Sequence, residues 1–244
     1  MEWLLEGASA LGLQLTAAQQ ASFQLYYESL VDWNQRFNLT AITDYEQVQI
    51  RHFLDSLSCL LARETRLALS RPGARMIDVG SGAGFPGVPL KLACPGARLT
   101  LLEATGKKVS FLEHLIEQLE LQTATAIKGR AEELAHDPAH REQYDLVLAR
   151  AVAELPVAIE YMLPFCRVGG WAVAQKGEAG AAEAWAAQHA INLLGGELRR
   201  VVPVELPRLP EDRSLVVVEK TSPTPAVYPR RPGIPSKRPL SLTP

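Results

Sequence analysis

The sequence predicts an α/β fold in which a mostly parallel sheet carries helices on both faces and follows a helical N-terminal extension. Short apolar segments rich in β-branched residues alternate with amphipathic segments from residue 75 onward, which is typical of strand-helix-strand units. A glycine-rich turn follows the first of these strands. The last two strands, 198–204 and 215–219, are joined by a polar loop without a helix, which predicts an antiparallel hairpin at one edge of the sheet.

The length of the chain, 244 residues, suits one elaborated domain or one domain with an appendage. We expect a helical extension over residues 1–70 that packs on the main domain, a ligand-binding domain over 71–220, and a proline-rich basic tail over 221–244. The apolar fraction of 47%, the charged fraction of 21% and the net charge of −2 are ordinary for a globular protein. The overall charge gives no nucleic-acid signature.

The cysteines and the N-terminus indicate a cytoplasmic protein. Cys59, Cys94 and Cys166 lie far apart and lack the spacing of metal ligands, so we expect reduced thiols and no metal. The N-terminus has no basic region before an apolar run, as a secretory signal would. No apolar run approaches the roughly 20 residues that span a bilayer, so we expect no membrane contact. Nothing in the sequence demands more than a monomer.

The first long element is a helix from Thr16, its predicted N-cap, to about Phe37. Apolar side chains recur along it at three- and four-residue steps, namely Phe23, Tyr26, Tyr27, Leu30, Trp33 and Phe37. Such a stripe is typical of a helix that packs against a core. We prefer that interpretation to a ligand surface.

A turn and a second helix follow. Asn38 and Thr40 leave the helical pattern and indicate a turn or cap. The second helix is predicted over residues 45–62, where His52 and Asp55 are three positions apart and share a face. The pair is either a proton-transfer dyad or a structural hydrogen bond, and the residues alone leave both open.

The first strand of the sheet, residues 75–79, leads into three glycines, Gly80, Gly82 and Gly84. Glycines let the backbone turn sharply and approach a ligand closely, and the ligand of such a sheet lies at the carboxyl end of the strand. A dinucleotide fingerprint would place its third glycine at Phe85. Asp78 would repel a pyrophosphate but suits a cationic ligand such as S-adenosylmethionine. A tight turn without a ligand is the alternative.

The next two strands end in further candidate ligand contacts. The second, 98–102, ends in Glu103, about 20 residues past the glycine loop, where a carboxylate accepts hydrogen bonds from ribose hydroxyls. The loop after the third strand, 123–128, lies beside the base in a nucleotide-binding sheet, so the Ala131 backbone and the Glu132 side chain are candidates for adenine contacts. The alternatives are a surface glutamate at the strand end and a helix N-terminus that favours acids.

Two cations mark the later strands. Arg150 follows the fourth strand, 144–149, and points into the crevice, where it would hold a cofactor carboxylate or a substrate phosphate. Pairing with an acid such as Asp78 is the alternative. Lys176 stands at the end of the fifth strand, 171–175, again on the ligand side. The connecting segments are predicted helices over 86–93, 105–121, 155–165 and 179–194, with a turn at Gly169-Gly170.

The last segment, residues 221–244, holds seven prolines and no hydrophobic periodicity, which predicts a polyproline-like or disordered tail. Tyr228 and four cations, Arg230, Arg231, Lys237 and Arg238, lie within it. Phosphate contacts combined with stacking would use this combination. A merely solvated tail is the alternative.

A series of short motifs runs over nearly the whole chain. They are Trp33-Asn34 with Asn38-Leu39-Thr40, His52 to Leu57, Asp78 to Gly87, Gly106-Lys107-Lys108, Gly129 to Glu133, Ala149 to Val152, Lys176-Gly177, and the tail from Tyr228 to Leu240. In this order they resemble the bacterial glucose-inhibited division protein B family, the 16S ribosomal RNA guanine-N(7) methyltransferases. Glu103 stands where the family more often has aspartate, which keeps the carboxylate.

The resemblance implies a Rossmann-like class I S-adenosylmethionine-dependent methyltransferase sheet over residues 71–220. It implies methyl transfer to N7 of a guanine in 16S rRNA, either free or within the small ribosomal subunit. Cofactor contacts are implied at Gly80, Phe85, Glu103, Ala104, Thr105, Ala131, Glu132 and Arg150, beside the loop glycines Gly82 and Gly84.

The chemistry explains why no catalytic base stands out. Guanine N7 carries a free lone pair and needs no deprotonation, so the task is to hold it in line with the methyl group. Our hypothesis is that Asn38, His52, Arg150 and Lys176 orient the base or its phosphates. Two other hypotheses about the function remain open. One is a nicotinamide-dependent oxidoreductase, which is disfavoured because Phe85 stands where a dinucleotide fingerprint has its third glycine. The other is a non-catalytic rRNA-binding assembly factor that uses only the tail.

Overall fold

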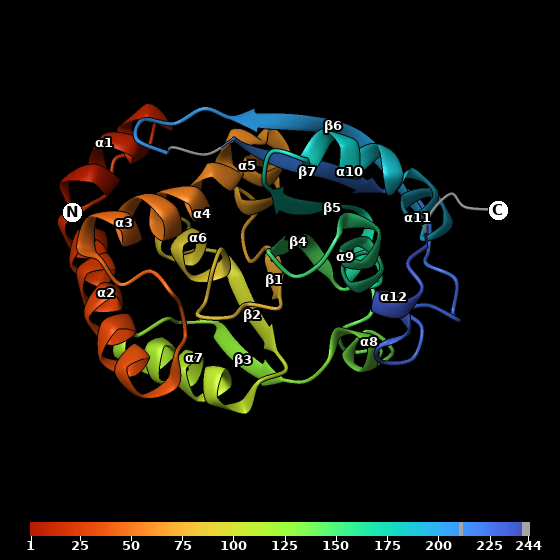
Figure 1. The fold of residues 1–244 in the computed structure, drawn as a ribbon, viewed down its shortest axis with the longest axis horizontal. Coiled ribbons are helices and arrows are strands. Elements are labelled where there is room, and N and C mark those ends of the chain that lie inside the picture. Colours follow the sequence, from red (N-terminus) through yellow and green to blue (C-terminus); the bar gives the residue numbers. More distant parts are fainter. Residues whose placement is uncertain (210–211, 241–244) are drawn as a thin grey trace.

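The computed structural model describes residues 1–209 and 212–240 (Figure 1). Its centre is a seven-stranded sheet with the order β3-β2-β1-β4-β5-β7-β6. The strands are β1 (Arg75–Val79), β2 (Arg98–Glu103), β3 (Ala124–Lys128), β4 (Tyr144–Arg150), β5 (Cys166–Lys176), β6 (Gly196–Val204) and β7 (Arg213–Lys220). The first five are parallel to one another, and β7 is antiparallel to both β5 and β6.

The strand order places a crevice at the middle of the sheet. The chain moves outward from β1 to β2 and β3 and then returns to add β4 on the other side of β1. The carboxyl ends of β1 and β4 therefore lie next to the point where the order reverses, which is where ligands of such sheets bind. The predicted antiparallel ending is confirmed, with β7 inserted between β5 and β6.

One face of the sheet is covered by the N-terminal half of the chain. The helices there are α1 (Glu2–Ala10), α2 (Ala17–Phe37), α3 (Tyr45–Val48), the π-helical η1 (Gln49–Leu54), α4 (Asp55–Leu57), the 3-10 helix η2 (Ser58–Leu61), α5 (Arg63–Leu69), α6 (Gly87–Ala93) and α7 (Gly106–Gln118). Their apolar side chains form one continuous core with the strand residues of that face, among them Met76, Leu101 and Leu148. The N-terminal helices thus share the core of the sheet.

The other face is covered by the C-terminal half (Figure 1). Its helices are α8 (Ala131–Leu134), α9 (Leu155–Met162), α10 (Gly180–Ala186), α11 (Gln188–Leu193) and α12 (Ile234–Lys237). They pack a second core against alternate strand residues such as Ile77, Val147 and Val216. The alternation follows from the period of two along a strand, which sends neighbouring side chains to opposite faces.

The predicted start and stop of α2 are confirmed. Thr16 accepts the Gln19 N–H at 3.2 Å and donates its own N–H to the Gln19 side chain at 2.8 Å, a reciprocal capping box. Asn38 ends the helix in the left-handed conformation, with φ of 48°. Phe23, Tyr26 and Leu30 are fully buried, so their stripe belongs to the core, as we expected.

The segment predicted as one helix over residues 45–62 is instead α3, η1, α4 and η2 in succession. The apolar spacing could not reveal this, because a π-turn shifts the register by only one residue. The helix α5 lies within the predicted helical extension, and α8 begins where a helix N-terminus was one of the two alternatives. The helix α12 is not predicted by the sequence, and Gly169-Gly170 lies within β5 instead of forming a turn between elements. None of the described helices is both long and apolar enough to cross a membrane.

The prediction of a polyproline-like or disordered tail is wrong for residues 221–240. This segment folds against α8 and α9 and contains α12 (Figure 1). Arg230 forms an ion pair with the buried Glu160 at 2.6 Å. Composition alone misses such long-range partners, and residues 241–244 lie outside the described part of the chain.

Candidate functional site

Two cavities open at the carboxyl edge of the sheet. The glycine-loop pocket, of about 170 Å³, is lined by Val79, Gly80, Leu102, Glu103, Ala104, Gly129, Arg130, Ala131, Glu132, Val152 and Tyr161. The arginine cavity, of about 340 Å³, is lined by Ile42, Arg51, His52, Asp55, Arg150, Ala151, Gln175, Lys176, Gly177, Glu183 and Arg213. The consecutive residues Ala151 and Val152 line different cavities, so the two sites share the loop that follows β4.

The three loop glycines are needed for different reasons. All three have positive φ, of 72° at Gly80, 59° at Gly82 and 98° at Gly84. A Cβ at Gly80 would lie 2.8 Å from Val152, and one at Gly84 would lie 2.7 Å from the Tyr26 hydroxyl. At Gly82 the nearest atom would be the Gly80 carbonyl oxygen, 4.0 Å away. Only Gly82 therefore leaves open space in which a ligand can approach the backbone.

Glu103 fastens this loop to the end of β2. Its carboxylate accepts the Gly82 N–H at 3.0 Å and the Thr105 N–H at 2.8 Å. The side chain is buried but still lines the pocket. Each carboxylate oxygen has two lone pairs, so Glu103 can hold the loop and also accept a ligand hydroxyl. Ala104 lines the same pocket, whereas Thr105 serves as the N-cap of α7.

Asp78 lies beneath the loop. One of its oxygens, Oδ2, accepts the Gly87 N–H at 2.8 Å, while Oδ1 is buried without a hydrogen-bond partner among the described residues. Burial raises the pKa of Asp78 to about 7. A buried carboxylate with an unused oxygen is stabilised by a nearby positive charge. The site therefore fits a cationic ligand such as S-adenosylmethionine better than a pyrophosphate.

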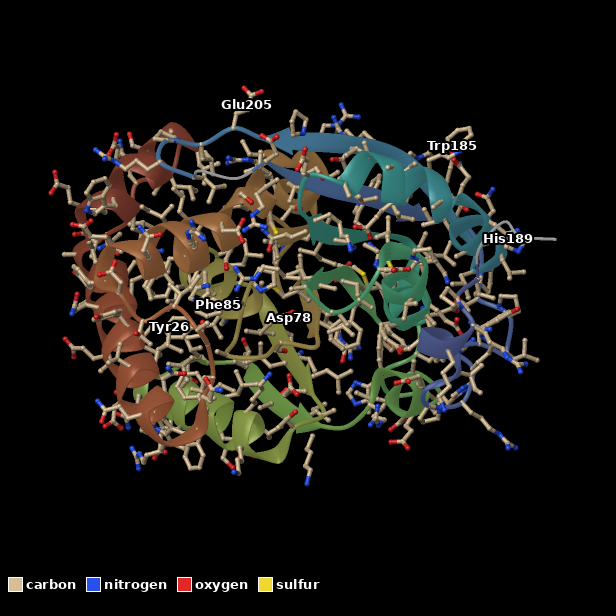
Figure 2. The ribbon with its side chains drawn as sticks, viewed as in Figure 1. Tyr26, Asp78, Phe85, Trp185, His189 and Glu205 are labelled. Carbon is tan, nitrogen blue, oxygen red and sulfur yellow. The ribbon has the colours of Figure 1, made fainter. Side chains whose placement is uncertain are left out.

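Phe85 lies in a stack of rings behind the loop. Its ring centre is 5.2 Å from that of Tyr26 and 4.5 Å from that of His52, and the Arg150 guanidinium lies 5.0 Å away. Figure 2 shows Tyr26, Phe85 and Asp78 close together in the interior. Gly84 and Phe85 are buried and line neither cavity. Their contact with a cofactor stays a prediction.

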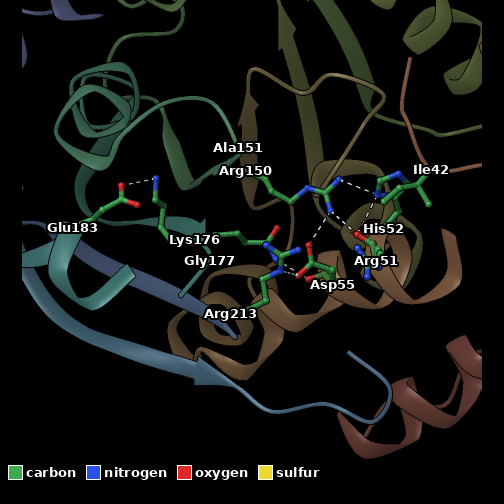
Figure 3. A pocket seen from close by; sticks show the side chains of 11 residues that line it. Ile42, Arg51, His52, Asp55, Arg150, Ala151, Lys176, Gly177, Glu183 and Arg213 are labelled. Atoms are coloured by element: carbon green, nitrogen blue, oxygen red, sulfur yellow. Dashed lines mark hydrogen bonds and ion pairs between the residues drawn. The ribbon is translucent and has the colours of Figure 1, made fainter. Parts of the chain in front are cut away.

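Arg150 is the centre of the arginine cavity (Figure 3). Its Nη1 donates to Asp55 Oδ2 at 2.9 Å and to the Arg51 carbonyl at 3.1 Å. Both side chains of the ion pair are largely buried, with 17% of Arg150 and 4% of Asp55 exposed. The alternative stated for Arg150, pairing with a nearby acid, is thus realised, with Asp55 in place of Asp78 as the partner. A guanidinium has five donors, so some remain for a ligand.

His52 is held as a neutral ring. Its Nδ1 lies 3.1 Å from the Arg51 carbonyl and its Nε2 lies 2.9 Å from the Thr40 hydroxyl. Burial and the nearby Arg150 lower the pKa of His52 to about 3. His52 and Asp55 meet through Arg150, which favours the structural interpretation of this pair over a proton-transfer dyad. The π-turn η1 that carries Arg51 and His52 belongs to a class of distortions found at functional sites.

Lys176 lies on the opposite wall of the arginine cavity. It forms an ion pair with Glu183 at 2.7 Å and donates to the Ala153 carbonyl at 2.9 Å. Figure 3 shows this pair on one side of the cavity and the Arg150 cluster on the other. The lining contains four basic side chains, including Arg51 and Arg213, and two acidic ones. The excess of positive charge favours an anionic ligand.

Among the predicted catalytic residues, His52, Arg150 and Lys176 come together in this cavity, whereas Asn38 does not line it. Asn38 ends α2, and the chain that follows brings Thr40 to His52 and Ile42 to the rim. A substrate contact at Asn38 stays a prediction.

Sequence reasoning missed Arg51, Gln175 and Arg213 as lining residues. A signal existed for Arg213. Because β7 runs antiparallel to β5, the first residue of β7 lies at the same edge of the sheet as the last residue of β5. Lys176 at the end of β5 is indeed opposite Ser214 in β7. Arg51 had no such signal, since the packing of η1 on the sheet brings it there.

Known proteins resemble this chain over nearly its whole length. Residues 19–215 match the family described as rRNA small subunit methyltransferase G. The protein called ribosomal RNA small subunit methyltransferase G in Roseiflexus castenholzii is 49% identical over 240 residues, covering 98% of this chain and 100% of the relative. The protein of that name in Dehalococcoides mccartyi is 48% identical with the same coverage.

Solved structures agree on the fold. The [4+2]-cyclase SpnF has a TM-score of 0.57 at 15% identity, covering 86% of this chain and 97% of its own. MtNAS in complex with MTA and tNA has a TM-score of 0.54 at 17% identity, covering 84% and 74%. They support the predicted Rossmann-like class I fold. Since the family match and the identity of nearly one half both extend over most of the sequence, the chain belongs to the rRNA small subunit methyltransferase G family.

Proposed function

We propose that this chain transfers the methyl group of S-adenosylmethionine to N7 of a guanine in 16S rRNA. The family gives the reaction class and the cofactor. Separate sites for cofactor and substrate are supported by the two cavities, which meet at the consecutive residues Ala151 and Val152. A methyltransferase family decides against the nicotinamide-dependent oxidoreductase and the non-catalytic assembly factor.

The glycine-loop pocket is the proposed cofactor site. S-adenosylmethionine, when bound, supplies an electrophilic methyl group on a sulfonium. Within the chain, Glu103 is placed to accept ribose hydroxyls while it holds the loop, and Asp78 provides the negative charge beneath it. Ala131 and Glu132 line the end of the pocket beyond β3, the place that we assign to the base.

The arginine cavity is the proposed substrate site. Its excess of basic side chains suits the phosphates that flank a guanine. Arg150 is held rigidly by Asp55 and can present its remaining donors without reorganisation. The neutral His52 does not serve as an acid at neutral pH, and methylation of N7 requires none. The role of these residues is to orient the base.

The tail offers a second region for rRNA. The side chains of Arg231, Lys237 and Arg238 are exposed on its outer surface. Exposed cations of this kind bind the phosphate backbone without reading sequence. We propose that they contact rRNA near the modified base, whereas Arg230 points inward to Glu160.

The test is to incubate the purified protein with methyl-labelled S-adenosylmethionine and small ribosomal subunits that lack the modification. We expect label at N7 of one guanine of 16S rRNA, located by nuclease mapping, and no label with the Arg150→Ala variant. Parallel incubation with naked rRNA shows which form is the substrate. Label at another atom, or on neither RNA despite cofactor binding, would refute the proposed reaction.

A further inference from the structure

The C-terminal segment reaches the wall of the glycine-loop pocket. The Gly233 N–H donates to Glu132 Oε1 at 3.1 Å, and the Ser236 hydroxyl lies 3.0 Å from that of Tyr161. Glu132 and Tyr161 both line the pocket. Residues more than 70 positions further along the chain thus hold two side chains of the proposed cofactor site.

A buried ion pair fixes the segment just before these contacts. Glu160 is fully buried on α9. It accepts the Arg230 backbone N–H at 2.8 Å and the side-chain nitrogens Nε and Nη2 at 3.0 and 2.6 Å. Paired donors from one guanidinium fix both distance and orientation. The position of Gly233, three residues later, is therefore well determined.

The beginning of the segment is fixed as well. Lys220 is fully buried and donates to the Leu163 and Leu194 carbonyls at 3.2 and 3.0 Å. Arg141 donates to the Thr224 and Tyr228 carbonyls, both at 2.9 Å. Figure 1 shows the segment running beside α8 and α9. It is a built part of the domain.

We propose that residues 221–240 act as a clamp that positions Glu132 for recognition of the adenine base, an inference that rests on the proposed function of the pocket. Gly233 has φ of 79°, which turns its N–H toward Glu132. Glu132 is 5% exposed, and its remaining lone pairs are available to an exocyclic amino group. Gly233 and Arg230 are positioning residues, since they act through Glu132.

The sharpest test is Gly233→Pro in the full-length protein, because proline lacks the N–H and cannot adopt positive φ. Gly12→Pro is the matched control. Gly12 is also left-handed, with φ of 71°, and donates to the Ser9 carbonyl at 2.9 Å on α1. By calorimetry we expect Gly233→Pro to weaken binding of S-adenosylmethionine about tenfold, as for loss of one charged hydrogen bond. Gly12→Pro should bind as the parent does.

A second pair of variants probes the anchor. Arg230→Gln should raise the KM for S-adenosylmethionine more than the KM for ribosomal subunits, with partial recovery in Arg230→Lys. Arg167→Gln is the control, since Arg167, near the start of β5, pairs at 2.7 Å with the largely buried Asp145 of β4. Thermal unfolding separates general instability, which both variants share, from the KM effect, which only the first shows.

Each outcome has one meaning. Cofactor affinity unchanged in Gly233→Pro, or equal changes in KM for both substrates in Arg230→Gln, overturns the clamp. If the parent protein does not bind S-adenosylmethionine at all, the proposed cofactor site is wrong and the clamp falls with it.

Discussion

The two cavities at the carboxyl edge are built in opposite ways. Most of the lining of the glycine-loop pocket comes from the ends of β1, β2 and β3 and the loops that follow them, with Val152 and Tyr161 added from the chain after β4. Its glycine loop is held by backbone N–H groups that donate to one carboxylate, that of Glu103. The arginine cavity takes its side chains from η1, α4, β4, β5, α10 and β7. Local sequence determines the glycine loop and the strand ends of the first site, whereas the charged lining of the second exists only when distant elements pack together. Substitutions should therefore affect the two sites differently.

The largest effect is expected from Arg150→Ala. It removes the centre of the arginine cavity and leaves the buried Asp55 with Arg213, 3.8 Å away, as its remaining ion-pair partner, which costs up to about 3–5 kcal/mol of unfolding free energy. Methyl transfer should fall by at least about a hundredfold, because misplacing a bound substrate by 1 Å has that effect. Single-turnover transfer to ribosomal subunits and urea unfolding measure the two consequences.

Arg199→Ala is the control, because Arg199 also pairs with a carboxylate, that of Glu219 at 2.7 Å, but does so on the partly exposed β6 edge. Transfer should be unchanged in this variant. Parent-like transfer by Arg150→Ala would mean that the arginine is structural and that our assignment of the cavity is wrong.

The pH dependence of stability should differ in sign between the two sites. Burial raises the pKa of Asp78 from 3.8 to about 7, so between these values the folded protein binds the extra proton and stability falls as pH rises. Burial and Arg150 lower the pKa of His52 from 6.5 to about 3, so there the unfolded chain binds the extra proton and stability rises with pH. The two contributions offset each other in the parent.

The variants Asp78→Asn and His52→Gln separate these contributions. Between pH 4 and pH 6.5 the unfolding free energy should rise with pH in Asp78→Asn and fall in His52→Gln. Each change should amount to about 3 kcal/mol over the range, at about 1.4 kcal/mol per pH unit and proton, so the two variants should diverge by about 6 kcal/mol. Urea titrations at several pH values measure it, and parallel curves for the two variants would contradict the assigned charge states.

A smaller effect is expected from Glu103→Gln, which retains the shape of the side chain but loses one accepting oxygen. One of the two loop N–H groups, on Gly82 or Thr105, then loses its partner. The affinity for S-adenosylmethionine should fall by about 1.5–3 kcal/mol, while binding of rRNA stays the same. Glu113→Gln on α7 is the control. Equal loss of both affinities would show that the sites are not separate.

The smallest effect concerns the loop that joins the cavities. Ala151 has φ of 53°, a conformation that costs a non-glycine residue about 1–2 kcal/mol. Ala151→Gly relieves this strain. The greater entropy of glycine in the unfolded chain offsets about 0.5–1 kcal/mol of that gain, so the folded protein should be about 0.5 kcal/mol more stable. Ala153→Gly, where φ is not positive, should be less stable than the parent. Thermal unfolding of the pair tests whether the loop is strained.

The sequence by itself determined the features whose partners lie nearby in the chain. Strand periodicity, the positive-φ glycines and the cap at Thr16 predicted the parallel sheet, the loop after β1 and the boundaries of α2. The position of Glu103 at the ligand-binding edge of the sheet followed from its place at the end of β2, since the carboxyl ends of parallel strands meet at one edge. Local backbone geometry is encoded within a few residues, and a single chain therefore reveals it.

Tertiary structure decided the partners of the charged groups. Arg150 pairs with Asp55 through the packing of α4 against the sheet, although the nearer strand offered Asp78. The tail looked disordered by composition, yet Arg230 and Gly233 find Glu160 and Glu132 about 70 and 101 positions earlier. Which carboxylate each of these groups pairs with depends on which buried carboxylate lacks a partner once the cores have formed. Because that is a property of the assembled fold, no local pattern in the sequence could reveal it.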